Sequence, residues 1–237
     1  MPAPSVHAFA EKVALITDGA NAVGRAVAMQ LALQGSYVIV GLAFDDQASA
    51  IEELKSLGTL ANAVKTDIST VEGAKTLVGE VEKMFGRIDL LVNCLKLETD
   101  SAFDETNEKA FDDSINANLK SAFFVTQEAI RLMKSRPKPK IVNLVSAIDT
   151  PEAEANVLYA ATQNALVGFT KSLAKSLPKN FRVNAVAVSE KQTSAENLDS
   201  ELFRAKKGIS EDDVARTIVY LLSSEAIGLN GQILTLE

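Results

Sequence analysis

Short runs of apolar residues alternate along the chain with longer segments that have a helical period. The short runs are mostly rich in Val, Ile and Leu and lie at residues 13–17, 37–42, 60–65, 88–93, 141–145, 182–188 and 231–236. Most of them show little polar alternation, which is typical of strands buried on both faces of a sheet. The amphipathic segments between them predict helices near residues 22–35, 46–57, 70–86, 105–134, 157–177 and 210–224.

This regular alternation predicts one doubly wound α/β domain. Strand–helix units in series form a parallel sheet through right-handed crossovers, with helices on both faces. No segment has the composition of an interdomain linker, because the Pro- and Lys-rich residues 135–140 simply end one helix before the next strand. We therefore expect a single domain over residues 1–237.

Charge and length exclude several classes of protein. The formal net charge is −7 and the sequence pI is about 5.0, which argues against a main task of binding nucleic acid or an anionic membrane. No apolar run approaches the roughly 20 residues that cross a bilayer, and the first dozen residues lack the features of a secretion signal. Cys94 is the only cysteine, so no intrachain disulfide can form. We expect a cytoplasmic protein, because that compartment is reducing.

The inventory of side chains narrows the possible chemistry further. His7 is the only histidine and lies near the amino terminus. A histidine-based metal site, a Ser-His-Asp triad and a Cys-His pair are therefore excluded, and we expect no metal. We interpret Cys94 as a small buried side chain, since no base or second ligand is predicted beside it.

The first strand, turn and helix form the candidate nucleotide site. Backbone N–H groups at such a turn can face a pyrophosphate. Read as G-x-G-x-x-G from Gly19, the motif has Asn21 at its central glycine. Read as a P-loop, it has Arg25 and Ala26 in place of the required Lys and Ser/Thr, which argues against a nucleoside triphosphatase. A tight turn without any ligand is an equally good interpretation of this segment alone.

Further motifs follow in a characteristic order. They are LLVN at 90–93, INANLKSAFFVTQEA at 115–129, IVNLVSA at 141–147, YAATQNALVGFTKSLA at 159–174, RVNAVAV at 182–188 and EDDVARTIVYLLSSEA at 211–226. With these motifs the chain resembles the short-chain dehydrogenase/reductase family, and in style its β-ketoacyl carrier-protein reductases. The resemblance implies a Rossmann-like, mostly parallel seven-stranded sheet that binds NAD(P) at the carboxyl ends of its strands.

The resemblance also implies four catalytic positions. In this family a tyrosine phenol exchanges a proton with the substrate, a serine orients the substrate oxygen, and an asparagine completes a proton path. The matching residues are Tyr159, Ser146 and Asn118. A structural role, in which Tyr159 is a packed helix residue whose hydroxyl contacts Ser146, is an equally good interpretation of that pair. The family's lysine, which holds the ribose and lowers the tyrosine pKa, is replaced by Gln163.

The missing lysine has a physical consequence. A phenol has an ordinary pKa of about 10, and bringing it close to 7 requires roughly 4 kcal/mol of preferential stabilisation of the anion. A neighbouring ammonium supplies much of this through its charge, whereas the amide of Gln163 is neutral. The amide can still bond a ribose hydroxyl, but Tyr159 becomes a poor general acid or base.

The coenzyme positions implied by the resemblance are also altered. They are Thr17, Asp18, Gly19, Ala22, Val23, Gly24, Asp67, Asn93 and Thr193. Asp18 and Ala22 replace two glycines of the family's turn. Aspartate tolerates a positive φ, but its carboxylate would repel a pyrophosphate. Lys96 is a candidate counter-charge for Asp18, and Asp67 can either bind adenine or cap the helix that follows it.

Together these changes predict a family member with impaired or absent NAD(P)-dependent activity, acting as a structural or regulatory subunit. The helices at 105–134 and 157–177 keep the apolar pattern expected for subunit pairing. We expect a homo-oligomer, or a hetero-oligomer with an active paralogue. Two alternatives stay open: an active carbonyl reductase or alcohol dehydrogenase that uses Tyr159, Ser146 and Asn118, and a module that binds a small molecule in the cleft.

Overall fold

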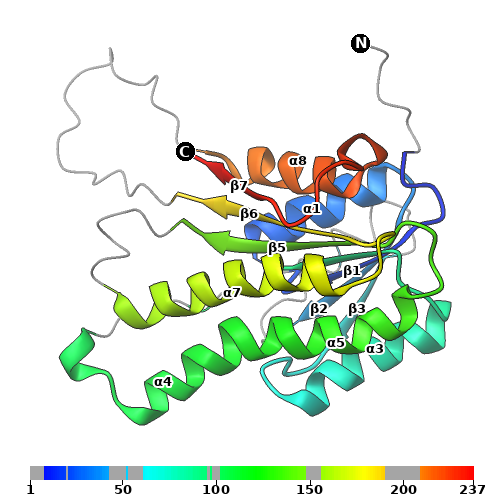
Figure 1. Cartoon of the computed structure of the whole chain (residues 1–237). Helices are drawn as coiled ribbons and strands as arrows, with labels where there is room; N and C mark the ends of the chain where they lie inside the picture. The colour runs from blue at the N-terminus through cyan, green and yellow to red at the C-terminus, as the bar shows by residue number, and fades with distance from the viewer. Residues whose placement is uncertain are drawn as a thin grey trace.

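The computed structural model describes residues 8–19, 21–42, 52, 61–94, 97, 102–147, 156–189 and 209–237. Within them a seven-stranded sheet lies at the centre, and every pair of neighbouring strands is parallel (Figure 1). The strands are β1 (Val13–Thr17), β2 (Tyr37–Leu42), β3 (Ala61–Lys65), β4 (Leu90–Asn93), β5 (Lys140–Ser146), β6 (Arg182–Val188) and β7 (Ile233–Leu236). Their order, β3-β2-β1-β4-β5-β6-β7, confirms the predicted doubly wound fold.

Helices cover both faces of the sheet, as successive side chains of β1 show by packing in opposite cores. The helices are α1 (Ala22–Leu33), α3 (Val71–Phe85), α4 (Glu108–Ser114), α5 (Ser121–Met133), α7 (Val157–Ser176) and α8 (Glu211–Leu222). Ile16 of β1 packs in the core formed with α1 and α8, and its neighbour Leu15 packs in the opposite core with α3 and α5. Burial on both faces explains why the strands read as continuous apolar runs.

The long helix expected over 105–134 is divided. A short 3-10 turn, η1 (Phe103–Glu105), precedes α4, and a π-helical segment, η2 (Ile115–Lys120), separates α4 from α5. Such wide turns leave a backbone bulge inside an otherwise regular helix. The expected helix at 46–57 lies outside the described residues apart from Glu52.

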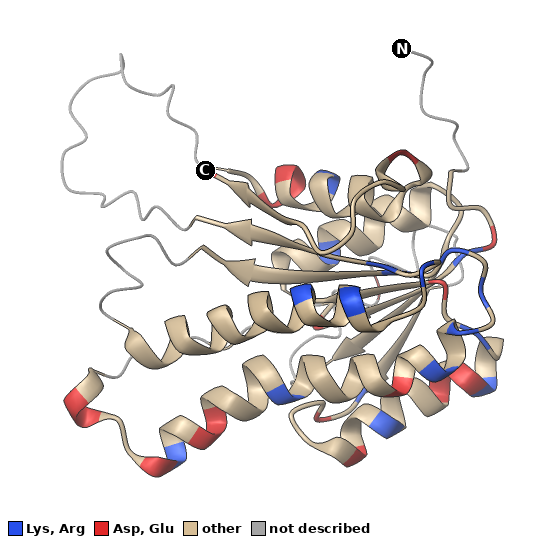
Figure 2. Cartoon of the chain, viewed as in Figure 1, with Lys and Arg blue, Asp and Glu red and all other residues tan. Residues whose placement is uncertain are grey.

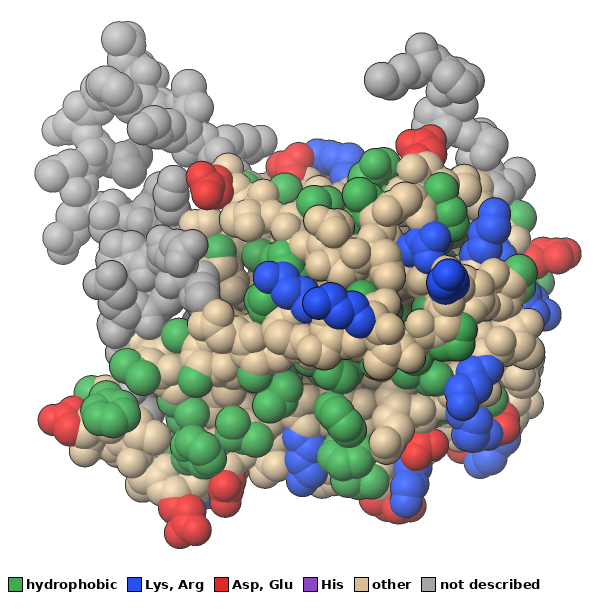
Figure 3. Space-filling model, in the orientation of Figure 1, with side chains coloured by type: hydrophobic (Ala, Val, Ile, Leu, Met, Phe, Trp, Pro, Cys, Tyr) green, Lys and Arg blue, Asp and Glu red, His purple; other side chains and the backbone are tan. Residues whose placement is uncertain are grey.

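Two surfaces of the molecule differ strongly in character. Lys and Arg gather where β1, β4, β5 and β6 begin, whereas Asp and Glu are prominent on α4 (Figure 2). The face formed by α4, α5 and α7 shows apolar side chains at the surface (Figure 3). On these helices Phe111, Phe123 and Val157 are 50%, 43% and 48% exposed, and Phe103 of η1, before α4, is 76% exposed.

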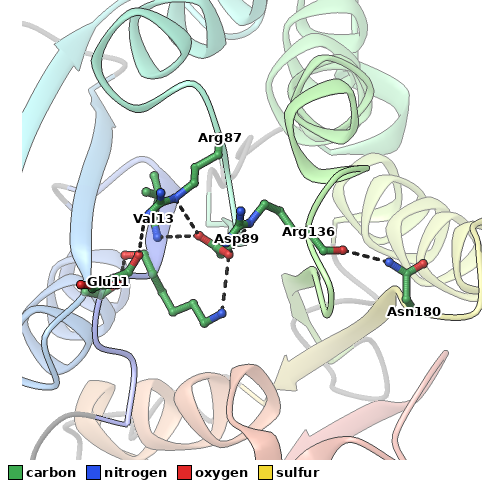
Figure 4. Close-up of polar contacts among 8 residues, drawn as sticks. Glu11, Val13, Arg87, Asp89, Arg136 and Asn180 are labelled. Atoms are coloured by element: carbon green, nitrogen blue, oxygen red, sulfur yellow. Dashed lines mark hydrogen bonds and ion pairs between the residues drawn. The ribbon is translucent and has the colours of Figure 1, made fainter.

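A buried carboxylate joins three segments at the beginning of the sheet (Figure 4). Asp89 is 2% exposed, and its Oδ2 accepts the backbone N–H of Val13 at 3.0 Å. Its Oδ1 accepts Nε of Arg136 at 2.8 Å and lies 3.6 Å from Nζ of Lys12. Arg87 Nε lies 3.7 Å from Oδ2. Asp89 therefore holds β1, the start of β4 and the loop before β5 together.

We predict that Asp89→Asn lowers the free energy of unfolding by about 3 kcal/mol, because it leaves three half-buried cations without their buried counter-charge. Urea unfolding followed by circular dichroism measures the effect. The matched control is Glu82→Gln, which removes an exposed pair with Arg131 and should leave the unfolding midpoint almost unchanged. Equal midpoints for the two variants would contradict the assignment.

Candidate functional site

A pocket opens at the carboxyl ends of the central strands. Its volume is about 270 Å³, and its lining residues are Asp18, Asn21, Ala22, Val23, Cys94, Leu144, Val145, Ser146, Val188 and Glu211. The strand order reverses here, because β1 pairs with β2 on one side and with β4 on the other. Such reversal points are where open α/β sheets bind ligands.

The turn after β1 is tight and depends on two glycines. Asp18 adopts a φ of 50°, which confirms that this position needs the left-handed region. A Cβ on Gly19 would lie 2.4 Å from Cβ of Val40, and a Cβ on Gly24 would lie 2.4 Å from the carbonyl oxygen of Asp18. Both glycines are therefore required for α1 to approach the sheet this closely, whether or not a ligand binds.

Asn21 organises this turn. Its Oδ1 accepts the backbone N–H of Gly24 at 2.7 Å and so caps α1. Its Nδ2 donates to Oδ2 of Asp18 at 3.0 Å and to the carbonyl oxygen of Cys94 at 3.1 Å. Cys94 N–H in turn donates to Oγ1 of Thr17 at 2.9 Å. The ends of β1 and β4 and the start of α1 are thus fixed relative to one another.

Ser146 and Tyr159 meet at the pocket. Ser146 ends β5, and its Oγ lies 2.7 Å from the phenol oxygen of Tyr159. Tyr159 stands in the first turn of α7, where Asn156 Oδ1 accepts its backbone N–H at 3.0 Å. The predicted contact between the two hydroxyls is present, and both side chains are largely buried.

Gln163 lies one turn further along α7 and is 2% exposed. Its side-chain oxygen accepts the backbone N–H of Ser146 at 2.9 Å. Because that N–H can only donate, the atom that faces it is Oε1 rather than Nε2. Gln163 therefore fastens α7 to the end of β5 with a neutral amide. Lys171 and Lys175 on the same helix are exposed and far from this point along it.

Asn118 is completely buried within the π-helical segment. Its Oδ1 accepts the N–H of Leu97 at 2.7 Å, and its Nδ2 donates to the carbonyl of Leu97 at 2.8 Å and to Oγ of Ser114 at 3.3 Å. The side chain thus clamps the segment that follows β4. Its role in a proton path stays a prediction.

Asn93 turns away from the pocket, into the layer between the sheet and helices α5 and α7. Its Nδ2 donates to Oγ1 of Thr126 at 3.0 Å and to Oδ1 of Asn143 at 2.7 Å. Asn143 continues the chain of bonds to Oγ1 of Thr170 at 2.8 Å. This side chain therefore supports the sheet from within, and a contact with coenzyme stays a prediction for it.

Asp67 stands just before α3 and its side chain is exposed. Its Oδ1 accepts N–H and Oγ–H of Ser69 at 3.0 and 2.6 Å, while Thr70 caps the helix by accepting the N–H of Gly73. Thr70 rather than Asp67 therefore caps α3, so the capping interpretation of Asp67 was wrong, and adenine binding by Asp67 is still only a prediction. Thr193 and Lys96 lie outside the described residues.

Known proteins are similar to this chain in sequence. The family model for short chain dehydrogenase matches residues 12–201. The chain belongs to this family. It is 30% identical to a 3-oxoacyl-(acyl-carrier-protein) reductase FabG from Staphylococcus aureus over 93% of this chain and 94% of that protein. A protein with the same description from Aquifex aeolicus is 31% identical, over 94% of each chain.

Solved structures agree with the short-chain dehydrogenase fold. A double mutant of a Serratia marcescens short-chain dehydrogenase/reductase has a TM-score of 0.86 at 26% identity, covering 97% of this chain and 98% of that one. An actinorhodin polyketide ketoreductase mutant crystallised with NADPH has a TM-score of 0.85 at 24% identity, with 95% of each chain covered. At that identity the second likeness supports the fold alone.

NAD(P), the usual coenzyme of short-chain dehydrogenases, has a negatively charged pyrophosphate, so the charges on the pocket wall bear on its binding. Among the described residues that line it, the charged ones are Asp18 and Glu211, and both are carboxylates. A unit negative charge about 5 Å from a pyrophosphate charge costs roughly 3 kcal/mol at an effective dielectric constant near 20. Ala22 also places a methyl group on the pocket wall. The sequence interpretation missed Glu211, although Ser210 and Asp213 form the capping box that fixes it in the first turn of α8.

Two further properties concern all of the described residues. Across the described ranges, no group of three or more His, Cys, Asp or Glu residues could hold a metal ion. No helix in those ranges is long and apolar enough to cross a membrane.

We predict that Cys94 is inert to thiol reagents in the folded protein. Burial, and secondarily the charge of Asp18, raise the pKa of this thiol well above its ordinary value, so almost no thiolate forms at neutral pH. Titration with a chromogenic disulfide at about pH 8 should give no fast phase in buffer and one thiol per chain in denaturant. Rapid labelling of the folded protein would contradict the described burial.

Proposed function

We propose that this short-chain dehydrogenase homologue has little or no NAD(P)-dependent oxidoreductase activity and serves as a structural or regulatory subunit. The observation that carries the proposal is the placement of Gln163, whose side-chain oxygen is bonded to the Ser146 backbone at 2.9 Å. The family's cationic lysine is therefore replaced by an amide that is already part of the fold. The carboxylates of Asp18 and Glu211 on the pocket wall support the same conclusion.

The chemistry left at the site is limited. Tyr159 and Ser146 form a hydroxyl pair that can donate hydrogen bonds to a carbonyl oxygen in the pocket. Gln163 stands where the family has its cationic lysine, so Tyr159 lacks that source of phenolate stabilisation and is a poor proton donor and acceptor in a reaction. The pair is suited to orienting a bound oxygen rather than to moving a proton.

One observation favours a second candidate function. The Ser146–Tyr159 distance of 2.7 Å preserves the hydroxyl arrangement of an active carbonyl reductase or alcohol dehydrogenase. In that case Nε2 of Gln163 would hold the ribose and Asn118 would complete the site. A third candidate, a small-molecule binding module, is supported by the pocket volume of about 270 Å³.

We predict that none of NAD⁺, NADH, NADP⁺ and NADPH raises the melting temperature of the protein, because the pocket repels their pyrophosphates. Binding to the native state alone would raise it by mass action, so thermal shift is a direct test. The double variant Asp18→Gly/Gln163→Lys, which removes one carboxylate and adds one cation, should gain a coenzyme-dependent rise. Glu80→Gln, which removes an exposed ion pair with Lys83 on α3, is the control.

Three outcomes separate the candidate functions. A rise of several degrees for the unmodified protein would contradict the proposal and favour an active enzyme. Measurable turnover of a carbonyl panel, increased further by Gln163→Lys, would establish the second candidate. A small molecule found by mass spectrometry of the purified protein, with no response to dinucleotides, would favour the binding module.

The subunit role requires an interaction surface, and we propose that the apolar face of α4, α5 and α7 pairs with a second copy. Phe123 contacts Phe124 edge to face and Phe169 at a tilt, with ring centroids 5.3 and 5.6 Å apart, so aromatic side chains of α5 and α7 lie against one another. Contiguous exposed apolar residues of this kind mark protein contacts. Two-fold pairing is the commonest arrangement for such soluble proteins.

We predict that Phe111→Glu/Phe123→Glu converts a homo-oligomer into a smaller species, because buried carboxylates would be left unpaired at the interface. Light scattering coupled to size-exclusion chromatography measures the mass. Leu33→Glu, on the exposed side of α1, is the control and should leave the mass unchanged. A protein that is monomeric before mutation would rule out self-association and leave pairing with an active paralogue.

A further inference from the structure

The basic edge is a row of cations at the beginning of the sheet, opposite the pocket. We define it as Lys12, Arg87, Arg136, Lys138, Lys140, Lys179 and Arg182. Four adjacent strands, β1, β4, β5 and β6, all start here, and they are about 4.8 Å apart, so the row extends for roughly 15 Å. Figures 2 and 3 show this concentration of Lys and Arg at the strand starts.

The backbone that carries these cations is firmly held. Nδ2 of Asn180 donates to the carbonyl of Arg136 at 3.0 Å, which joins the loop before β5 to the loop before β6 (Figure 4). Nη1 of Arg182 donates to the carbonyl of Lys179 at 2.7 Å. Lys138 stands between two prolines, which fix φ on either side of it. A partner would therefore meet a preorganised surface and lose little free energy in ordering it.

The basic edge has more positive charge than its own carboxylates neutralise. Asp89 already contacts three of the cations, Lys12, Arg87 and Arg136. The other four members have no ion pair with any described residue; they are Lys138, Lys140, Lys179 and Arg182. Glu11 beside Lys12 and Glu225 in η4 (Ser224–Ala226) are the neighbouring exposed carboxylates.

Lys140 lies close to other cations of the basic edge. It is 4% exposed, and its Nζ donates to the carbonyl of Ser223. Burial, and after it the charges of Arg182, Lys138 and Lys12 in that order, together lower the pKa of Lys140 to about 8. The cations are thus close enough to repel one another, and an external anion would relieve the repulsion.

The rest of the chain decides which anion fits. Because the net charge is −7 although the edge is positive, the remaining surface is strongly negative. At physiological salt charges act over about 8 Å, so a long nucleic acid or a flat anionic membrane would extend past the edge and be repelled. A short acidic segment of a protein can contact the basic edge without reaching the negative surface around it.

We propose that the basic edge is a docking surface for a short acidic segment of another protein. Carboxylates of that segment pair with the exposed Lys138 and Lys179. Arg182 and Lys140 are register partners at the starts of β6 and β5, and they add positive potential while the carbonyls of Ile227 and Ser223 hold them. This surface is separate from the pocket, so the proposal does not depend on whether the protein binds a dinucleotide.

The test uses a fluorescein-labelled octaglutamate peptide and fluorescence anisotropy, at about 50 mM and about 300 mM salt. Three proteins are compared: the unmodified chain, Lys138→Glu/Lys179→Glu, and the control Lys75→Glu/Lys109→Glu on α3 and α4. Both variants have the same net charge. We expect the edge variant to bind roughly tenfold or more weakly at low salt, and the control to bind like the unmodified chain. Circular dichroism verifies that each variant is folded.

Three results would overturn the proposal. Equal weakening in both variants would mean that net charge alone determines peptide binding. Absence of peptide binding to the unmodified chain at low salt would show that the basic edge is not a docking surface. Tighter binding of an octathymidine oligonucleotide or of phosphatidylserine vesicles than of the peptide would exclude an acidic protein as the partner.

Discussion

The side chain of Asn21 is the contact on which the geometry of the pocket depends. Its oxygen caps α1 at Gly24, and its amide nitrogen bonds both Asp18 and the carbonyl of Cys94. One amide thereby fixes the bend after β1, the first turn of α1 and the end of β4. The aspartate is held at the pocket wall by the same residue that begins the helix. Its negative charge is consequently part of the architecture of the turn, and a ligand must accommodate it.

The site and the basic edge lie at opposite ends of the same parallel strands, and their charges are opposite. At the carboxyl ends the described pocket residues contribute Asp18 and Glu211, and at the amino ends Asp89 is outnumbered by cations. Parallel strands allow this separation because each strand contributes its first residue to one edge and its last to the other. The two ends can therefore have different partners on a single domain.

The strands and most helices were predictable because burial on both faces produces continuous apolar runs. Every predicted strand begins and ends within two residues of the observed one. The division of 105–134 was not predictable, since the apolar period continues through the π-helical segment while Asn118 bonds Leu97 at 2.7 and 2.8 Å. That contact joins residues 21 positions apart, and no local pattern encodes it.

The sequence predicted several residues of the site, but only some of the contacts between them. Ser146 and Tyr159 meet as expected, because a strand end and a helix start 13 positions apart are brought together by one crossover. The orientation of Gln163 was not evident, because a glutamine amide can face either way until its neighbour is known. The sequence interpretation missed Glu211 in the pocket and, at the opposite end of the sheet, the cations around Asp89, because these residues come from segments far apart in the chain. Tertiary structure alone places them.

The apolar face and the basic edge also constrain one another. The face of α4, α5 and α7 covers one side of the sheet, whereas the basic edge lies along the starts of the strands (Figure 1). Pairing through the helices would leave the row around Lys138 and Lys179 accessible on both copies. A dimer would then present two cationic rows, and an acidic protein with two such segments would bind it more tightly than the sum of separate contacts, since the second contact becomes intramolecular. Loss of the apolar contact should thus weaken a bivalent acidic partner while leaving the binding of a single short peptide unchanged.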